Sequence, residues 1–214
     1  MILYGSSMSP FVRKVLAFAG EKGIALESRP VGVADTNPAF LAASPLGKMP
    51  ALDDDGYLLA DSSAIVHYLE AKHPEPALIP SDPQERGRVI WFDEYADTVI
   101  MACAAKIFFN RVVAPRFLKR AGDLELAATT ERDELPKVLD YLESVVPDQG
   151  FLVGDKLTLA DLAIVSPLAN FGYMDMEIDA GRHPRLRAFS ERILARPSFA
   201  SWTDRERAFL ARAA

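Results

Sequence analysis

Cysteine and histidine are scarce in this chain, and their scarcity limits the chemistry that it can perform. Cys103 is the only cysteine among 214 residues, which excludes an internal disulfide and a cluster of thiolate metal ligands. Its neighbours in "VIMACAAKIFF" are small or apolar, which favours a buried, inert thiol over a reactive one. The three histidines, His67, His73 and His183, do not have the spacing of metal ligands. We therefore predict no metal site.

The sequence also lacks an excess of basic residues and a long apolar run. Acidic residues outnumber basic ones by 30 to 24, and the basic residues are scattered, so we expect no nucleic-acid partner. Polar residues interrupt the first apolar run by position 5, and no segment reaches the roughly 20 apolar residues of a membrane span. We expect a soluble, cytoplasmic protein without a membrane partner. Half of the residues are hydrophobic, enough for one large core or two small ones.

The first third of the chain alternates strand-like and helical segments. The run "ILY" predicts a strand, and apolar residues at Val12, Val15, Leu16 and Ala19 predict a helix over 10–22. The segment "LESRPV" predicts a second strand, and two short runs around Asp55-Gly56 predict a β-hairpin. A helix over "DSSAIVHYLEAK" follows. This order indicates a small mixed sheet with helices packed on it, over residues 1–75.

The rest of the chain is helical in pattern. Four prolines in "PEPALIPSDPQ" predict a linker over 76–84. Beyond it, helical periodicity predicts an all-helical domain over 85–214, with helices near 85–113, 123–146 and 158–172 and two shorter ones after His183 and Pro197. Thr158 and Asp161 have the spacing of a capping box, which we assign to folding and not to chemistry.

Two groups of small polar residues can be interpreted in more than one way. In "SSMSP", Pro10 suits the first position of a helix and Ser9 its N-cap. The Ser9 hydroxyl either caps the helix or donates a hydrogen bond to a thiolate bound beside the helix N-terminus. The "DSS" at 61–63 is similarly either an ordinary N-cap cluster or a site where Asp61 meets an ammonium and Ser62 a carboxylate.

Four motifs, "SPFVRKV", "GKMPAL", "DSSAI" and "LTLADLAI", occur in this order and together resemble the glutathione transferase family. The chain is most similar to the serine-type cytosolic members, such as the bacterial, zeta and tau forms. The resemblance covers the whole chain and implies a thioredoxin-like first domain and an all-helical second domain. It also implies glutathione as co-substrate, a homodimer in the cytoplasm and a role in detoxification.

The resemblance assigns the residues that would bind glutathione. It implies a cis peptide bond before Pro50, with the backbone of Met49 pairing with the cysteinyl part of glutathione. It implies that Asp61 and Ser62 hold the γ-glutamyl end. Lys48 either reaches the glycine carboxylate or is a solvated loop lysine.

The resemblance places the catalytic hydroxyl at Ser9, where it would stabilise the glutathione thiolate that attacks a small hydrophobic electrophile. Ser6 and Ser7 are alternates, and Tyr4, the tyrosine-type alternative, fits the core better. The second substrate is expected between the domains, although aromatic residues at helical spacing more often belong to a core. The residues expected to line its pocket are Met8, Phe11, Tyr95 and Phe108. A glutathione-dependent isomerase, a dehalogenase and a non-catalytic regulatory or interaction module of the same fold are the alternatives.

Overall fold

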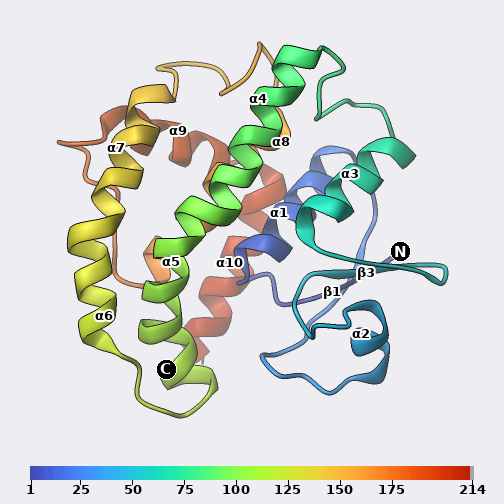
Figure 1. Cartoon of the computed structure of the whole chain (residues 1–214), viewed down its shortest axis with the longest axis horizontal. Coiled ribbons are helices and arrows are strands. Elements are labelled where there is room, and N and C mark those ends of the chain that lie inside the picture. Colours follow the sequence, from blue (N-terminus) through green and yellow to red (C-terminus); the bar gives the residue numbers. More distant parts are fainter. Residues whose placement is uncertain (213–214) are drawn as a thin grey trace.

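The first part of the chain forms a four-stranded mixed sheet (Figure 1). The computed structural model describes residues 1–212. The strand order is β2-β1-β3-β4, with β1 parallel to β2 and antiparallel to β3. The strands are β1 (Ile2–Tyr4), β2 (Glu27–Arg29), β3 (Ala51–Asp54) and β4 (Tyr57–Ala60). The predicted hairpin is confirmed, since β3 and β4 pair through a turn in which Asp55 and Gly56 both have positive φ.

Both faces of the two central strands are covered, and alternate residues of each strand contribute to opposite faces. Leu3 and Leu52 belong to the main core, together with α1 (Pro10–Glu21) and α3 (Ser62–Lys72). Tyr4 instead packs with Phe40 of α2 (Pro38–Ala43), and their ring centroids are 6.3 Å apart. The helix predicted over 10–22 is confirmed and ends one residue earlier.

The second part is entirely helical among the described residues. One continuous helical segment is built from α4 (Pro83–Glu94), a π-helical stretch (Tyr95–Ile100), α5 (Met101–Phe108) and a second π-helical stretch (Phe109–Phe117). The others are α6 (Leu124–Thr129), a third π-helical stretch (Thr130–Glu134), α7 (Leu135–Val145), α8 (Leu159–Leu168), a 3-10 turn (Phe171–Tyr173), α9 (Pro184–Leu194) and α10 (Pro197–Arg212). Within the range 123–146, where a helix is predicted, α7 buries one apolar face made of Leu135, Val138, Leu139 and Leu142.

The segment from Pro83 to Phe117 departs from the sequence expectation, because by length and composition alone it could cross a membrane. In the structure, part of its apolar surface packs against the rest of the protein. Val89, Phe92 and Ile100 are buried in the main core, and α4 packs along α8. The buried side of this segment is part of the main core.

Helix α8 is wholly buried and begins at the capping box that the sequence predicts. The Asp161 carboxylate accepts hydrogen bonds from the backbone N–H groups of Leu152 and Thr158, both at 2.8 Å. Helix α8 packs against α4, α9 and α1. In Figure 1, α1 lies between the sheet and the helical part, so the two parts share one core. This position brings the N-terminus of α1 to the boundary between the two parts.

Candidate active site

The turn between β1 and α1 is held in place by a glycine. Gly5 has a φ of +148°, and a Cβ there would lie 2.4 Å from a side-chain carbon of Val12. The backbone N–H of Ser9 donates to the Ser6 carbonyl at 2.9 Å. Ser9 is the N-cap residue of α1, yet its side chain makes no capping hydrogen bond within the described chain. Its hydroxyl is therefore not used by the helix.

Helix α8 and the residues after it fix the same turn from the other side. The Ser166 hydroxyl donates to the carbonyl of Pro10 at 2.7 Å, and the Asn170 amide donates to the carbonyl of Met8 at 3.1 Å. Buried Arg13 donates in turn to the Ser166 carbonyl at 2.7 Å and to the Asn170 side chain at 2.8 Å. The second domain thus sets the position of the Ser9 backbone.

Two cavities meet beside this turn. We call the larger one, of about 710 Å³, the polar cavity; its lining includes Lys48, Met49, Pro50, Asp61, Ser62 and Asp97. We call the other, of about 460 Å³, the apolar cavity; its lining includes Ser9, Met8, Val33, Met49, Phe108 and Phe209. Met49 lines both, so a molecule bound in the polar cavity can approach Ser9 across this side chain.

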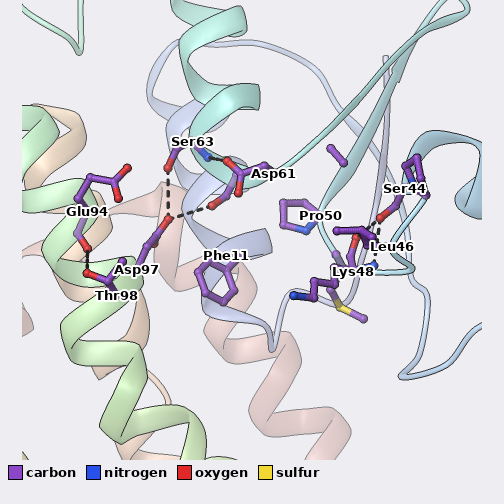
Figure 2. Close-up of a pocket in the computed structure, with 14 residues that line it drawn as sticks. Phe11, Ser44, Leu46, Lys48, Pro50, Asp61, Ser63, Glu94, Asp97 and Thr98 are labelled. Carbon is purple, nitrogen blue, oxygen red and sulfur yellow. Dashed lines mark hydrogen bonds between the residues drawn. The ribbon is translucent and has the colours of Figure 1, made fainter.

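The polar cavity has charges of opposite sign at its two sides. Figure 2 shows Lys48 and Pro50 on one side and Asp97 on the other, with Phe11 between them. The Met49–Pro50 peptide bond is cis, as the resemblance implies. The loop that carries Lys48 is pinned by Ser44, whose hydroxyl donates to the Lys48 carbonyl at 2.6 Å. Such a cavity suits an extended ligand with a carboxylate at one end and an ammonium at the other.

Asp97 is a site residue that the sequence analysis missed. Buried Lys14 reaches Asp93 at 2.6 Å, Asp97 at 2.7 Å and the Ser63 hydroxyl at 3.1 Å, so all three of its ammonium protons have acceptors. Two carboxylates around one ammonium leave one net negative charge beside the cavity. Burial raises the pKa of Asp97, and the attraction of Lys14 offsets only part of that rise. The spacing of Asp93 and Asp97 on one helix face was the available signal.

The predicted pair Asp61 and Ser62 lies at the same side of the cavity. Asp61 is the N-cap of α3, and one of its oxygens accepts from the backbone N–H groups of Ser63 and Ala64 at 2.9 and 3.0 Å. The capping interpretation of "DSS" is therefore realised in the structure. The Ser62 hydroxyl donates to the Asp97 carboxylate, with 3.3 Å between the two oxygens.

The structure separates the four residues expected around the second substrate. Met8 and Phe108 line the apolar cavity, whereas Phe11 lines the polar one. Tyr95 lies elsewhere, inside the helical domain, where its ring is 4.9 Å from that of Tyr141. Burial raises the pKa of Tyr95 to about 12. The expectation fails for Tyr95 because helical spacing identifies a buried face without identifying what packs on it.

The other predicted hydroxyls have distinct positions. Ser6 lines the apolar cavity and a neighbouring groove, while Ser7 lines only the groove. The tyrosine-type alternative, Tyr4, is 2% exposed and packs against α2, so it belongs to the core. Cys103 is buried, and burial raises the pKa of its thiol, as expected for an inert cysteine.

A thioredoxin-like domain joined to an all-helical domain, with a polar and an apolar cavity at the boundary, defines the class of glutathione-dependent transferases. The comparisons with known proteins agree with this class. Residues 3–77 match the family profile "Glutathione S-transferase, N-terminal domain", and residues 108–206 match "Glutathione S-transferase, C-terminal domain".

Relatives align over almost the whole chain. The maleylacetoacetate isomerase of Pseudomonas aeruginosa is 33% identical over 92% of this chain and 91% of its own. Glutathione S-transferase 3 of Zea mays is 34% identical over 92% and 90%. A solved glutathione S-transferase of Methylobacterium radiotolerans, in complex with glutathione sulfonate, has a TM-score of 0.77 and 28% identity over 94% and 93%. The chain belongs to the glutathione S-transferase family.

Proposed function

We propose that glutathione binds in the polar cavity with its sulfur at the Met49 edge, and that its thiolate attacks an apolar electrophile held in the apolar cavity. The carboxylate of the glycine end would meet Lys48, and the γ-glutamyl end would meet Asp61, Ser62 and Asp97. The charge distribution of the cavity supports this direction, since its acidic side carries more carboxylates than Lys14 can neutralise. In this arrangement the nucleophile belongs to glutathione, and the protein orients it.

We assign the stabilisation of the thiolate to Ser9. The observation that carries this assignment is that Ser9 lines the apolar cavity while its hydroxyl is not used as a helix cap. A hydroxyl has one proton to donate, and a thiolate at the Met49 edge offers it an acceptor. The N-terminus of α1 adds a favourable dipole, because its first N–H groups lack intrahelical partners. Both effects favour the ionised thiol and so lower its pKa.

The variant Ser9→Ala tests this assignment. We expect the pKa of bound glutathione to rise and its affinity to stay nearly unchanged, because a donor to the sulfur stabilises the thiolate and not the tripeptide as a whole. The loss of transition-state stabilisation should be about 3 kcal/mol at most, as for a single donor to a developing anion. Ultraviolet absorbance of the thiolate measures the titration, and turnover of chlorodinitrobenzene measures the rate.

Two matched serine variants complete the test. Ser7→Ala removes a hydroxyl from a residue that does not line the apolar cavity. The pKa of glutathione bound to this variant should equal the pKa of glutathione bound to the unmodified protein. Ser6→Ala removes the alternate hydroxyl inside the apolar cavity. An unchanged titration in Ser9→Ala, with a raised pKa in Ser6→Ala, would transfer the role to Ser6.

A glutathione-dependent isomerase is the second candidate, favoured by the identity of 33% with the maleylacetoacetate isomerase of Pseudomonas aeruginosa. The two activities differ in stoichiometry, since a transferase consumes glutathione and an isomerase regenerates it. The homodimeric state, the cytoplasmic location and the role in detoxification stay predictions from the resemblance. Exposed apolar side chains such as Leu46, at 81%, and Trp91, at 54%, are surfaces that a dimer would cover, and sedimentation measures that state.

A further inference from the structure

A groove of about 380 Å³ continues from the apolar cavity towards the C-terminal helix. The two share Ser6, Met8, Pro30 and Phe209 in their linings, so they adjoin each other. The groove lies between the turn that follows β1 and helix α10. Its lining includes Ser7 and Ser28 from the first domain and Trp202, Arg205 and Arg212 from α10. The proposed acceptor site is therefore longer than the apolar cavity alone.

Aromatic and cationic side chains alternate along the groove-facing side of α10. Trp202, Arg205, Phe209 and Arg212 follow one another at intervals of three or four residues, which places them on one face of the helix. The Arg205 guanidinium lies over the Trp202 ring, 4.9 Å from its centroid. Within residues 1–212, neither Arg205 nor Arg212 has a carboxylate partner. The charge of Arg205 is thus not neutralised by a carboxylate of the described residues.

The single carboxylate of the groove is already neutralised. Glu206 is 3% exposed and accepts two hydrogen bonds from Arg13, at 2.6 and 3.2 Å. It also accepts a hydrogen bond from the Tyr173 hydroxyl at 2.6 Å. The remaining polar groups of the groove wall are serine hydroxyls and the two guanidinium groups. The groove therefore presents positive charge next to aromatic rings.

The groove leads directly into the aromatic part of the apolar cavity. Phe209 is 52% exposed, and its ring is stacked parallel to that of Phe117, with centroids 6.2 Å apart. Both rings line the apolar cavity. A planar apolar group bound there would lie in the cavity that Ser9 lines, and Phe209 also lines the groove that contains Arg205.

We propose that the groove binds the anionic end of the acceptor, so that the electrophiles of this protein are planar apolar molecules that carry a carboxylate. This inference rests on the proposed function for the position of the electrophilic carbon, whereas the binding of the carboxylate in the groove does not depend on it. Arg205 would pair with the carboxylate through its planar fork of N–H donors, while Trp202 and Phe209 contact the apolar body. The electrophilic carbon then lies in the apolar cavity, next to the glutathione sulfur.

A matched pair of acceptors isolates the carboxylate. In 4-chloro-3-nitrobenzoate the glutathione thiolate attacks the carbon that bears chlorine, forming a C–S bond while the C–Cl bond breaks and chloride leaves with the electron pair. The thiol proton has already passed to solvent. The amide 4-chloro-3-nitrobenzamide undergoes the same substitution without the negative charge. Each enzymatic rate is divided by its uncatalysed rate, which removes the intrinsic difference between the two compounds.

Turnover tests the position of Arg205. In Arg205→Gln, we expect kcat/KM for the benzoate to fall about tenfold, typical of losing one partly exposed charge-assisted hydrogen bond, and the value for the amide to stay the same. The control is Arg207→Gln, which removes the same charge from the same helix at a residue paired with Asp204 outside the groove. An equal fall for both acceptors, or none, would overturn the proposal.

A binding measurement keeps this proposal separate from the proposed function. Of the two tryptophans, Trp202 lines the groove and Trp91 lies on α4, so in Trp91→Phe the fluorescence reports on the groove. Without glutathione, the nitrobenzoate should quench Trp202 with an affinity several-fold above that of the amide, and Arg205→Gln should abolish this preference. Quenching without turnover of either acceptor would contradict the proposed function and retain the anion site. Equal affinities would overturn the anion site.

Discussion

Asp97 gives the polar cavity the negative charge that Lys14 does not neutralise. Its carboxylate is partly exposed to the cavity and partly bound to Lys14, Ser62 and Ser63. Lys14 also neutralises Asp93, so this group of three charges remains negative. The ammonium of a bound ligand would neutralise this remaining negative charge. Asp97 is thus a stronger candidate for the γ-glutamyl ammonium than Asp61, whose carboxylate already caps α3.

We predict that Asp97→Asn weakens glutathione binding by about tenfold, the value of one charge-assisted contact. Because burial raises the pKa of Asp97, the carboxylate takes up a proton at a higher pH than an ordinary aspartate. Protonation removes the charge that the ammonium needs, so affinity should fall as the pH is lowered through this raised pKa. In Asp97→Asn that decrease should be absent. Calorimetric titration across the acid range measures both effects.

A neighbouring carboxylate provides the control for Asp97. Glu94 lines the same cavity but is exposed, and its side chain is not bound to Lys14. Glu94→Gln removes the same charge and should change the affinity by less than about twofold, since exposed charges interact weakly through water. If Asp97→Asn binds glutathione as tightly as the unmodified protein does, Asp97 does not hold the ammonium.

At the scale of the element, α8 depends on one carboxylate at its start. Asp161 is buried and accepts from the backbone N–H groups of Leu152 and Thr158 and from the Thr158 hydroxyl at 3.1 Å. We predict that Asp161→Ala lowers the free energy of unfolding by about 3 kcal/mol, because a cap is lost and buried donors are left without acceptors. Urea unfolding followed by circular dichroism measures this change.

The variant Asp161→Asn separates shape and hydrogen bonding from charge. It keeps the size of the side chain and one accepting oxygen, so it should lose less stability than Asp161→Ala. Burial raises the pKa of Asp161, which means that the folded protein pays a cost for its ionisation, and the neutral amide avoids that cost. An alanine variant as stable as the unmodified protein would show that α8 does not depend on its capping box.

The elements that the sequence predicts best are those with local causes. The strand "ILY", the helix that begins at Pro10, the turn at Asp55-Gly56 and the capping box at Thr158 each follow from a few adjacent residues. Periodicity also predicts the long helix after the linker, which extends through Phe117. The π-helical stretches inside it were not predicted, because an apolar periodicity that runs through a long segment does not show where individual turns widen.

The site was predictable only where a motif or the family resemblance named its residues. Lys48, Met49, Pro50, Asp61 and Ser62 do line one cavity. The contact between Lys14 and Asp97 joins residues 83 positions apart, and no local pattern encodes such a pairing.

Aromatic residues illustrate the same limit. Phe108 lines the apolar cavity and Tyr95 packs in the core, although both have helical spacing in one continuous segment. Which face of that segment meets a cavity depends on how the helices pack, and this information is not present in their spacing.

At the scale of the molecule, helix α1 joins the two domains through adjacent buried cations. Arg13 pairs with Glu206 of α10 at 2.6 Å, and Lys14 pairs with Asp93 of α4 at 2.6 Å. All four side chains are 2% exposed or less. Buried pairs contribute little net stability, but they penalise any arrangement that separates the partners. We infer that these pairs fix the relative position of the domains, and with it the boundary where the two cavities meet.

We predict that breaking the ion pair of Arg13 and Glu206 destabilises the protein. Glu206→Gln should lower the free energy of unfolding by about 3 kcal/mol, because it leaves the Arg13 charge buried without its anion. The double variant Arg13→Met, Glu206→Leu should be more stable than Glu206→Gln, since it removes both charges. Glu191→Gln, which breaks the exposed pair of Arg187 and Glu191, should cost less than about 0.5 kcal/mol.

Two probes followed through urea unfolding distinguish this coupling from a local effect. Tryptophan fluorescence reports on Trp91 and Trp202, which both lie in the helical domain, whereas circular dichroism reports on the whole chain. Because the pair joins the domains, the two transitions should coincide in the unmodified protein and in every variant that keeps Lys14 and Asp93. The double variant should still turn over more slowly, because Arg13 supports the Ser166 and Asn170 contacts that hold the turn around Ser9. Full activity in a stable double variant would mean that the turn is positioned without the second domain.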